Sequence, residues 1–291
     1  MSLYIPPQPN ISLAWLETLS RVSDEGGRAV NVLTTVTDPA AGEVTGIRDV
    51  VDRHLYPHVR GGSQIQTVQT VANTIFPRSW YRYSGSAFSI DMDELDLDGL
   101  DQAANRLYDG YKGILPILLK FNGNNRGTYF SRMISWPGKA VDGRNQLADR
   151  IARLRGQRRN SADNVNDIVV GGEATFDDPT FTDLRGVQVY SETDTRTRGF
   201  PCLVHIDLTV FDGKLSLVAT YRHQQLVTKA YGNLLGLARL LRFLSEQTGY
   251  PLGELAVMAT LADAEHGGPW NKRTVRAMIQ SASAEAGGGL F

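Results

Sequence analysis

Residues 203–221 read LVHIDLTVFDGKLSLVATY, with apolar and polar side chains alternating on both sides of a central Asp212-Gly213 pair. This alternation is typical of half-buried strands, and Asp-Gly between two such runs is a strong signal for a two-residue hairpin turn. The stretch therefore predicts antiparallel strands at 203–211 and 214–221. In ideal register Cys202 lies opposite His223 on one face, with Arg222 diagonally adjacent on the other, and a bulge would be needed to bring all three together.

A buried helix is expected directly after this hairpin. Residues 233–249, NLLGLARLLRFLSEQTG, are apolar around most of a helical circumference. Asn233 is a candidate cap and Gly249 a candidate stop for this helix. Elsewhere, periodicity and turn signals predict helices at 11–27, 100–113 and 143–159 and strands at 29–37 and 128–138.

These elements predict an α/β (α+β) fold in which a mixed sheet surrounds a central buried helix. We expect residues 1–291 to form a single domain with a polar insertion at about 156–200. The glycine-rich end, residues 282–291, is expected to be a flexible tail.

Composition limits the function classes. Hydrophobic residues make up 42% of the 291 residues, and the net charge is −1, so there is no global basic field to attract polymeric nucleic acid. The apolar runs are too short to span a bilayer, and the N-terminus lacks the features of a signal peptide. A single cysteine fits a reducing compartment. We therefore expect a cytoplasmic protein with no membrane partner.

The only cysteine, Cys202, has two ordinary explanations. It is either a small buried hydrophobe or a nucleophile. A nearby cation such as Arg222 would lower the pKa of the thiol and favour the reactive thiolate.

Three further features accompany Cys202. Pro201-Cys202 leads into the hairpin, Tyr221-Arg222 ends it, and Gly232-Asn233 opens the buried helix. In this order and spacing, with 20 residues from cysteine to arginine and 11 from arginine to asparagine, they resemble the core of thymidylate synthases. The segment GTYFSRMISWPG, which contains Tyr129, is similar to the active-site tyrosine segment of that family. Residues 253–266 resemble its ribose-binding strand.

The resemblance implies a thymidylate synthase-like fold, a homodimer and a pyrimidine nucleotide site. In this family the cysteine adds to C6 of the ring, and C5 then attacks a one-carbon unit carried by 5,10-methylenetetrahydrofolate. Carried over, Cys202 and Tyr129 would be catalytic, Arg222 would bind the phosphate bidentately, and Asn233 would read the base edge.

The chain departs from the family pattern at several of these contacts. His223 and Gln225 stand where the family has a serine and an aspartate. Asp263 and Glu265 lie in the region where the family has a histidine and a tyrosine that bind the sugar hydroxyl. Arg158 and Arg159 are displaced candidates for the arginines that a partner subunit gives to the phosphate.

The folate side and the proton relay also differ. Trp80 belongs to a basic-aromatic cluster that could stack a folate or base ring. The family's N-terminal glutamate has no clear counterpart, with Glu43 and Asp52 as alternatives, and its folate-closing tail is not recognisable.

Three interpretations follow. The first is a C5 methyltransferase or hydroxymethyltransferase acting on a pyrimidine nucleotide monophosphate. The second is a non-catalytic relative that binds a nucleotide or a protein. The third is an unrelated α+β protein in which Cys202 is part of the core.

Overall fold

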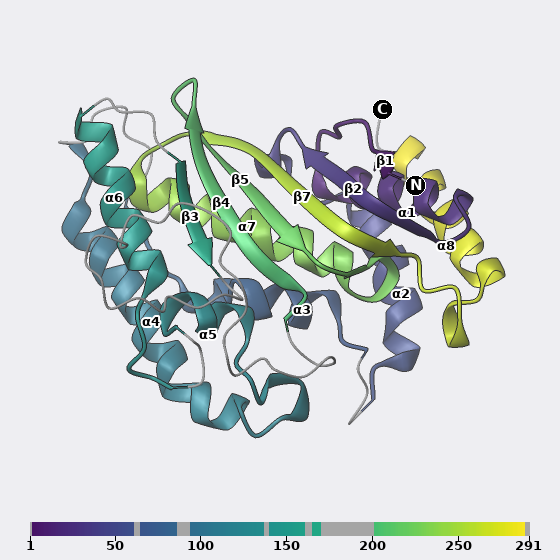
Figure 1. Ribbon diagram of the computed structural model, residues 1–291, viewed down its shortest axis with the longest axis horizontal. Coiled ribbons are helices and arrows are strands. Elements are labelled where there is room, and N and C mark those ends of the chain that lie inside the picture. Colours follow the sequence, from purple (N-terminus) through teal and green to yellow (C-terminus); the bar gives the residue numbers. More distant parts are fainter. Residues whose placement is uncertain are drawn as a thin grey trace. The chain divides into compact units, whose positions relative to one another are not determined.

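The computed structural model describes residues 2–60, 65–85, 94–136, 140–160, 165–169 and 201–288 (Figure 1). They combine helices with strands that pair in both parallel and antiparallel fashion, which confirms the predicted α/β class with a mixed sheet. The chain divides into two compact units. Unit 1 contains Met1–Phe76, Thr220–Arg239 and Gly253–Phe291, and unit 2 contains Pro77–Ala219 and Leu240–Leu252.

The strands of unit 1 form a mixed sheet. β1 (Ser2–Tyr4) runs parallel to β2 (Arg28–Val36), which pairs with β7 (Leu252–Asp263) in antiparallel fashion. The two-residue β6 (Gln224–Gln225) runs parallel to the end of β7. The strands expected at 29–37 and 253–266 are therefore present.

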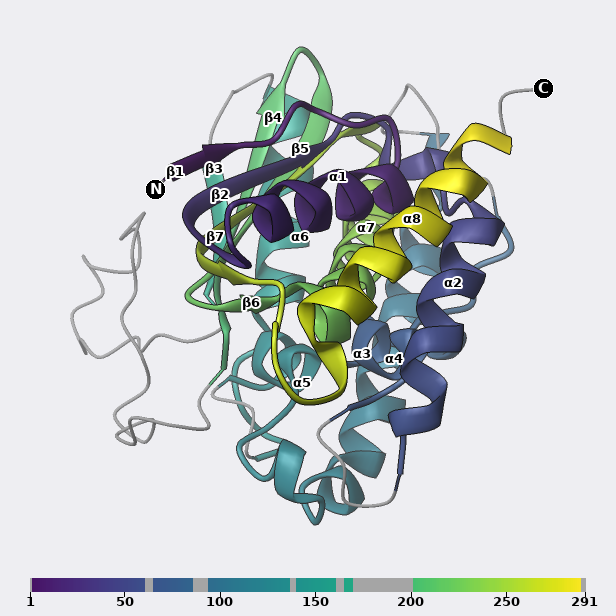
Figure 2. The same cartoon turned by 90° about the vertical axis from the view of Figure 1, so that its right-hand side faces the viewer.

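Four further helices in the described parts of the chain belong to unit 1. They are α1 (Ile11–Asp24), α2 (Thr45–Leu55), α3 (Val68–Ile75) and α8 (Lys272–Gly288). Helix α8 lies between α1 and α2, as Figure 2 shows. Because α8 continues to Gly288, residues 282–288 are helical, whereas we expected a flexible tail from residue 282.

Helix α7 (Tyr231–Thr248) is the expected buried helix, because only Arg239 and Arg242 among its residues are not buried. It follows directly on a π-helical turn, η7 (Leu226–Ala230). Asn233 is therefore the third residue of the helix and does not cap it, which corrects the expectation from sequence. The predicted stop is present, since Gly249 has a φ of 73° and its N–H donates to Ser245 O at 2.8 Å.

The strands of unit 2 follow the order β5-β4-β3. β4 (Leu203–Phe211) and β5 (Lys214–Tyr221) have the predicted bounds, with the last two residues of β5 assigned to unit 1. Asp212 and Gly213 have φ values of 50° and 69°, as a type I′ turn requires. β3 (Val165–Val169) pairs antiparallel with β4, and residues 170–200, most of the expected insertion, lie outside the described residues.

The helices of unit 2 differ from expectation at three places. They are α4 (Leu97–Leu118), α5 (Tyr129–Ile134) and α6 (Gln146–Asn160). Residues 128–138 were expected to be a strand, but the Thr128 hydroxyl caps a helix by accepting from Ser131 N at 3.1 Å. Because α6 continues to residue 160, the start of the expected insertion is helical.

Helix α4 runs past Gly110 and Gly113, although Gly113 was expected to end it. At Gly110, an added Cβ would lie 2.6 Å from Trp80 Cε3, so this glycine makes room for the indole. Short 3-10 turns complete the fold at Pro39–Ala41, Tyr56–His58, Arg78–Trp80, Asn122–Asn124 and Gly268–Trp270.

Candidate functional site

The residues singled out from the sequence fall into one set in each unit. The set in unit 2 consists of Cys202, Tyr129, Trp80, Arg158 and Arg159, and the set in unit 1 consists of Arg222, His223, Gln225, Asn233 and Asp263. Each set is described here within its own unit.

Cys202 and Tyr129 lie together in unit 2. Cys202 immediately precedes β4 and is partly exposed, unlike a typical core cysteine. The Tyr129 hydroxyl, at the start of α5, accepts from the backbone N–H groups of Cys202 at 3.3 Å and Leu203 at 3.4 Å. Desolvation raises the pKa of Tyr129 to about 12, so the hydroxyl is protonated at neutral pH. This tyrosine therefore holds the backbone that carries the thiol.

The other three candidates in unit 2 have packing roles or lie on the surface. Arg158 Nη1 donates to Thr248 O at 3.3 Å, and its guanidinium lies 5.4 Å from the centre of the Tyr250 ring. A cation at this position stabilises the C-terminus of α7. Arg159 is exposed. Trp80 lies against Gly110 of α4 and remains 40% exposed, which leaves part of the indole accessible.

The unit 1 set is centred on the end of β7. Asp263, only 7% exposed, accepts from Arg28 Nε at 2.9 Å and from Glu265 N at 2.7 Å. Gln225 is the β-ladder partner of Asp263, and its side chain is exposed. His223 Nε2 lies 3.7 Å from Asp263 Oδ2, beyond hydrogen-bond distance. The structure thus brings together His223, Gln225 and Asp263, three of the residues predicted to bind substrate.

Glu265 has a role that the sequence analysis missed. Its carboxylate accepts from Val227 N at 2.9 Å, from Thr228 N at 2.8 Å and from Thr228 Oγ1 at 2.8 Å. It thereby binds N–H groups of the π-helical turn η7, just ahead of α7. Burial raises the pKa of Glu265. Because 37 residues separate Glu265 from Thr228, no local sequence signal could have identified this contact.

Asn233 is a buried polar residue on an apolar helix. It is 5% exposed, and its amide makes no hydrogen bond to any residue in the described parts of the chain. Arg222, which follows β5, is half-buried, and its carbonyl accepts from Thr260 Oγ1 at 2.6 Å. Asn233 therefore has an amide available to a ligand.

The two alternatives to the family's glutamate share one partner. Glu43 Oε1 lies 2.7 Å from Arg48 Nη1, and Asp52 Oδ2 lies 2.6 Å from Arg48 Nε. The Arg48 guanidinium in turn lies 5.9 Å from the centre of the Tyr231 ring. Both carboxylates are therefore engaged in an ion-pair network of unit 1.

No protein-family model matches the chain, and no curated protein matches it. Within the described residues, His, Cys, Asp and Glu side chains do not gather in groups of three or more suited to a metal. The helices of the described parts are also too short or too polar to cross a membrane.

Proposed function

We propose that this protein transfers a one-carbon unit, methyl or hydroxymethyl, to C5 of a pyrimidine nucleotide monophosphate in the cytoplasm. The observation that carries the proposal is the position of Cys202. A core cysteine would be buried, whereas Cys202 is a partly exposed residue just before β4, on a backbone held by Tyr129. A position that solvent reaches is what a nucleophile needs to meet a substrate.

In the proposed chemistry the Cys202 thiolate adds to C6, and the electron pair of the C5–C6 bond moves to C5 and the C4 carbonyl. C5 then attacks the one-carbon unit supplied by 5,10-methylenetetrahydrofolate. The C5 proton would then be lost, and the bond between the transferred carbon and the folate nitrogen would break, which leaves an exocyclic methylene on C5. For methyl transfer this methylene would take a hydride from the tetrahydrofolate, which leaves as dihydrofolate. For hydroxymethyl transfer it would take water, and tetrahydrofolate would be released. Elimination of the Cys202 thiolate restores the ring in both cases. The covalent adduct divides one difficult substitution into easier steps. Tyr129, protonated at neutral pH, would position the thiol through the backbone.

The unit 1 residues support a nucleotide as the substrate. The Asn233 amide presents a donor and an acceptor, the pair that a pyrimidine base edge requires, and it is not occupied by a described residue. Asp263 and Gln225, paired on β7 and β6, are candidates for the sugar hydroxyls. Arg222 would bind the phosphate, because its planar guanidinium suits bidentate contact.

A homodimer is part of this proposal. Several apolar residues on the sheet of unit 1 are exposed: Tyr4 at 66%, Val30 at 41% and Leu33 at 37%. Tyr4 pairs with Leu33, which pairs with the partly exposed Met258. Such a patch is suited to covering by a second copy of the chain. Leu33→Glu should lower the mass measured by light scattering to that of a monomer, and a wild type that is monomeric at all concentrations would refute the dimer.

The alternative is a non-catalytic nucleotide-binding protein or interaction module. It is favoured by the engagement of both Glu43 and Asp52 with Arg48, because a proton relay around the base needs an available carboxylate. In this case Arg222, Asn233 and Asp263 would bind a nucleotide without turnover.

One experiment separates these functions. UMP, dUMP, CMP and dCMP are titrated by calorimetry, and release of tritium from C5 is followed with and without 5,10-methylenetetrahydrofolate. The enzyme predicts folate-dependent release that Cys202→Ala abolishes while nucleotide binding persists. Arg222→Ala should abolish binding, whereas Arg273→Ala on the exposed side of α8 should not. Binding without release supports the alternative, and no binding of any nucleotide refutes both.

A further inference from the structure

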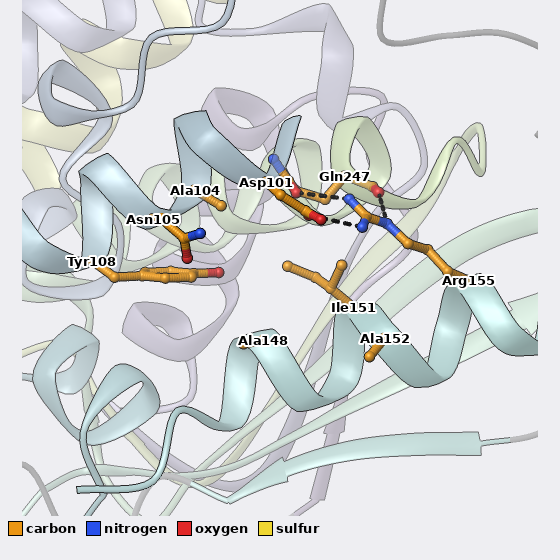
Figure 3. A pocket seen from close by; sticks show the side chains of 9 residues that line it. All are labelled: Asp101, Ala104, Asn105, Tyr108, Ala148, Ile151, Ala152, Arg155 and Gln247. Carbon is orange, nitrogen blue, oxygen red and sulfur yellow. Dashed lines mark hydrogen bonds and ion pairs between the residues drawn. The ribbon is translucent and has the colours of Figure 1, made fainter. Parts of the chain in front are cut away.

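A cavity of about 270 Å³ lies between α4 and α6 of unit 2 (Figure 3). Its lining residues are Asp101, Ala104, Asn105, Tyr108, Ala148, Ile151, Ala152, Arg155 and Gln247. On each of the two helices, the lining residues lie three, four and seven positions after the first one, which is Asp101 on α4 and Ala148 on α6. Residues with this spacing share one side of a helix, so each helix contributes one face to the cavity. Alanines at three of these positions leave the space between the helices open.

Tyr108 places an unsatisfied hydroxyl in this cavity. The residue is 3% exposed, and its hydroxyl has no hydrogen-bond partner within the described parts of the chain. Figure 3 shows the hydroxyl pointing into the space between the helices. The ring packs edge-to-face on Phe243, with centroids 6.3 Å apart. Burial raises the pKa of Tyr108, so the hydroxyl stays protonated and can donate a hydrogen bond.

The charged groups of the cavity balance each other. Arg155 Nη1 donates to Asp101 Oδ1 at 2.8 Å, and Arg155 Nε donates to Gln247 O at 2.7 Å. The Gln247 amide is fixed as well, because its Nε2 donates to Tyr81 Oη at 3.2 Å and to Leu100 O at 3.0 Å. A charged ligand would therefore lose hydration without meeting an unbalanced opposite charge.

We propose that this cavity binds a small, flat, neutral ring that carries an amide-like carbonyl and N–H, such as a lactam, a pyridone or a nucleobase. The Tyr108 hydroxyl donates to the carbonyl, and the Asn105 amide at the exposed rim offers both a donor and an acceptor. Ala104, Ile151 and Ala152 supply apolar contact for the ring. The volume suits one or two rings, because pockets for drug-sized ligands begin at about 300 Å³.

The proposal does not depend on the function proposed above, because Cys202, Arg222 and Asn233 do not line the cavity. Its test uses 2-pyridone as the probe. Calorimetry measures its affinity for the full chain, and thermal unfolding measures its effect on the melting temperature. Benzoate is the charged comparison and toluene the apolar one. We expect 2-pyridone to bind more tightly than either and to raise the melting temperature.

Two tyrosine variants on α4 make the test specific. Tyr108→Phe should weaken 2-pyridone about tenfold by removing one hydrogen bond, while the melting temperature without ligand stays the same or rises. Tyr111→Phe is the matched control. The Tyr111 hydroxyl forms a hydrogen bond of 2.7 Å with Thr128 Oγ1, and Tyr111 does not line the cavity. It should lower the melting temperature and leave 2-pyridone affinity unchanged.

Ala152→Leu fills the cavity from an exposed position and should abolish binding. No binding of 2-pyridone by the wild type would overturn the proposal. So would unchanged affinity in Tyr108→Phe or Ala152→Leu, or tighter binding of benzoate or toluene.

Discussion

Replacing Gly236 with alanine should destabilise the protein by about 2 kcal/mol, although alanine is the better helix former. Gly236 lies within α7, where it faces α3 in unit 1. A Cβ added there would lie 2.8 Å from Ala72 O and 2.9 Å from Ile75 Cβ. Both distances are too short for a normal contact, and one of the partners is a backbone carbonyl that no side-chain rotation can move.

The magnitude follows from two opposing effects. Removing glycine from a helix interior stabilises by up to about 1 kcal/mol, and overpacking a tight contact costs about 1–3 kcal/mol. Because α3 must shift as a whole, we take the upper end of that cost. Gly113 is the matched control, since it is exposed within α4 and an added Cβ would meet nothing within 4 Å. Gly113→Ala should therefore stabilise by about 0.5–1 kcal/mol.

Urea unfolding of the two variants, followed by circular dichroism, gives the free energies of unfolding. The free energy should depend on urea concentration with the same slope in both variants and the wild type, which is the check that the comparison is valid. The reasoning predicts changes of opposite sign for the same chemical substitution. If Gly236→Ala is as stable as the wild type, the close contact between α3 and α7 does not exist as described.

Three further predictions concern residues around the candidate site. Glu265→Ala should lower the free energy of unfolding in urea by about 2–3 kcal/mol, because two backbone N–H groups lose their acceptor, whereas Glu265→Gln should change it little at pH 7. The folded pKa of Glu265 is raised above 4.5, so its contribution to stability is present below pH 4.5 and is lost as pH rises through the folded pKa. Glutamine does not titrate, so the free energy of unfolding of Glu265→Gln should rise relative to that of the wild type over that pH range. Thr128→Ala should cost about 1 kcal/mol in thermal unfolding through loss of the α5 cap, and Thr128→Ser should restore it. Because the pKa of Tyr129 is raised to about 12, an ultraviolet alkaline titration should show that Tyr129→Phe removes a late-titrating tyrosine, and wild-type stability should fall as pH rises through 12.

The elements that the sequence predicted well are those with local signals. The β4–β5 hairpin has the predicted bounds because its turn residues and its alternation act over a few positions. Helix α5 was mistaken for a strand because its aromatic and branched residues favour strands, whereas Thr128 capping decides the outcome. Gly113 looked like a helix stop, but α4 simply continues through it.

The candidate site was predictable only in part, and for a similar reason. The resemblance singled out Tyr129 and Cys202, and the structure places the Tyr129 hydroxyl against the Cys202 backbone. The pairing of Gln225 with Asp263 depends on the two-residue strand β6, which the sequence did not predict. Arg158 proved to be bound at the end of α7, a contact set by tertiary packing. Such contacts join residues far apart in the chain, and propensity carries no information about them.

Asn233 offers a direct test of whether the buried polar group serves a ligand. Asn233 is 5% exposed as a residue, so Asn233→Leu, which is similar in volume and apolar, should keep the free energy of unfolding within about 1 kcal/mol of the wild type. The same variant should lose affinity for pyrimidine monophosphates, because the donor and acceptor for the base edge are gone. Asn233→Asp keeps the shape and one acceptor, and should bind more weakly while gaining no stability. A leucine variant that is less stable than the wild type yet binds nucleotide normally would show that Asn233 has a structural role, and the nucleotide proposal would then lose its base-reading residue.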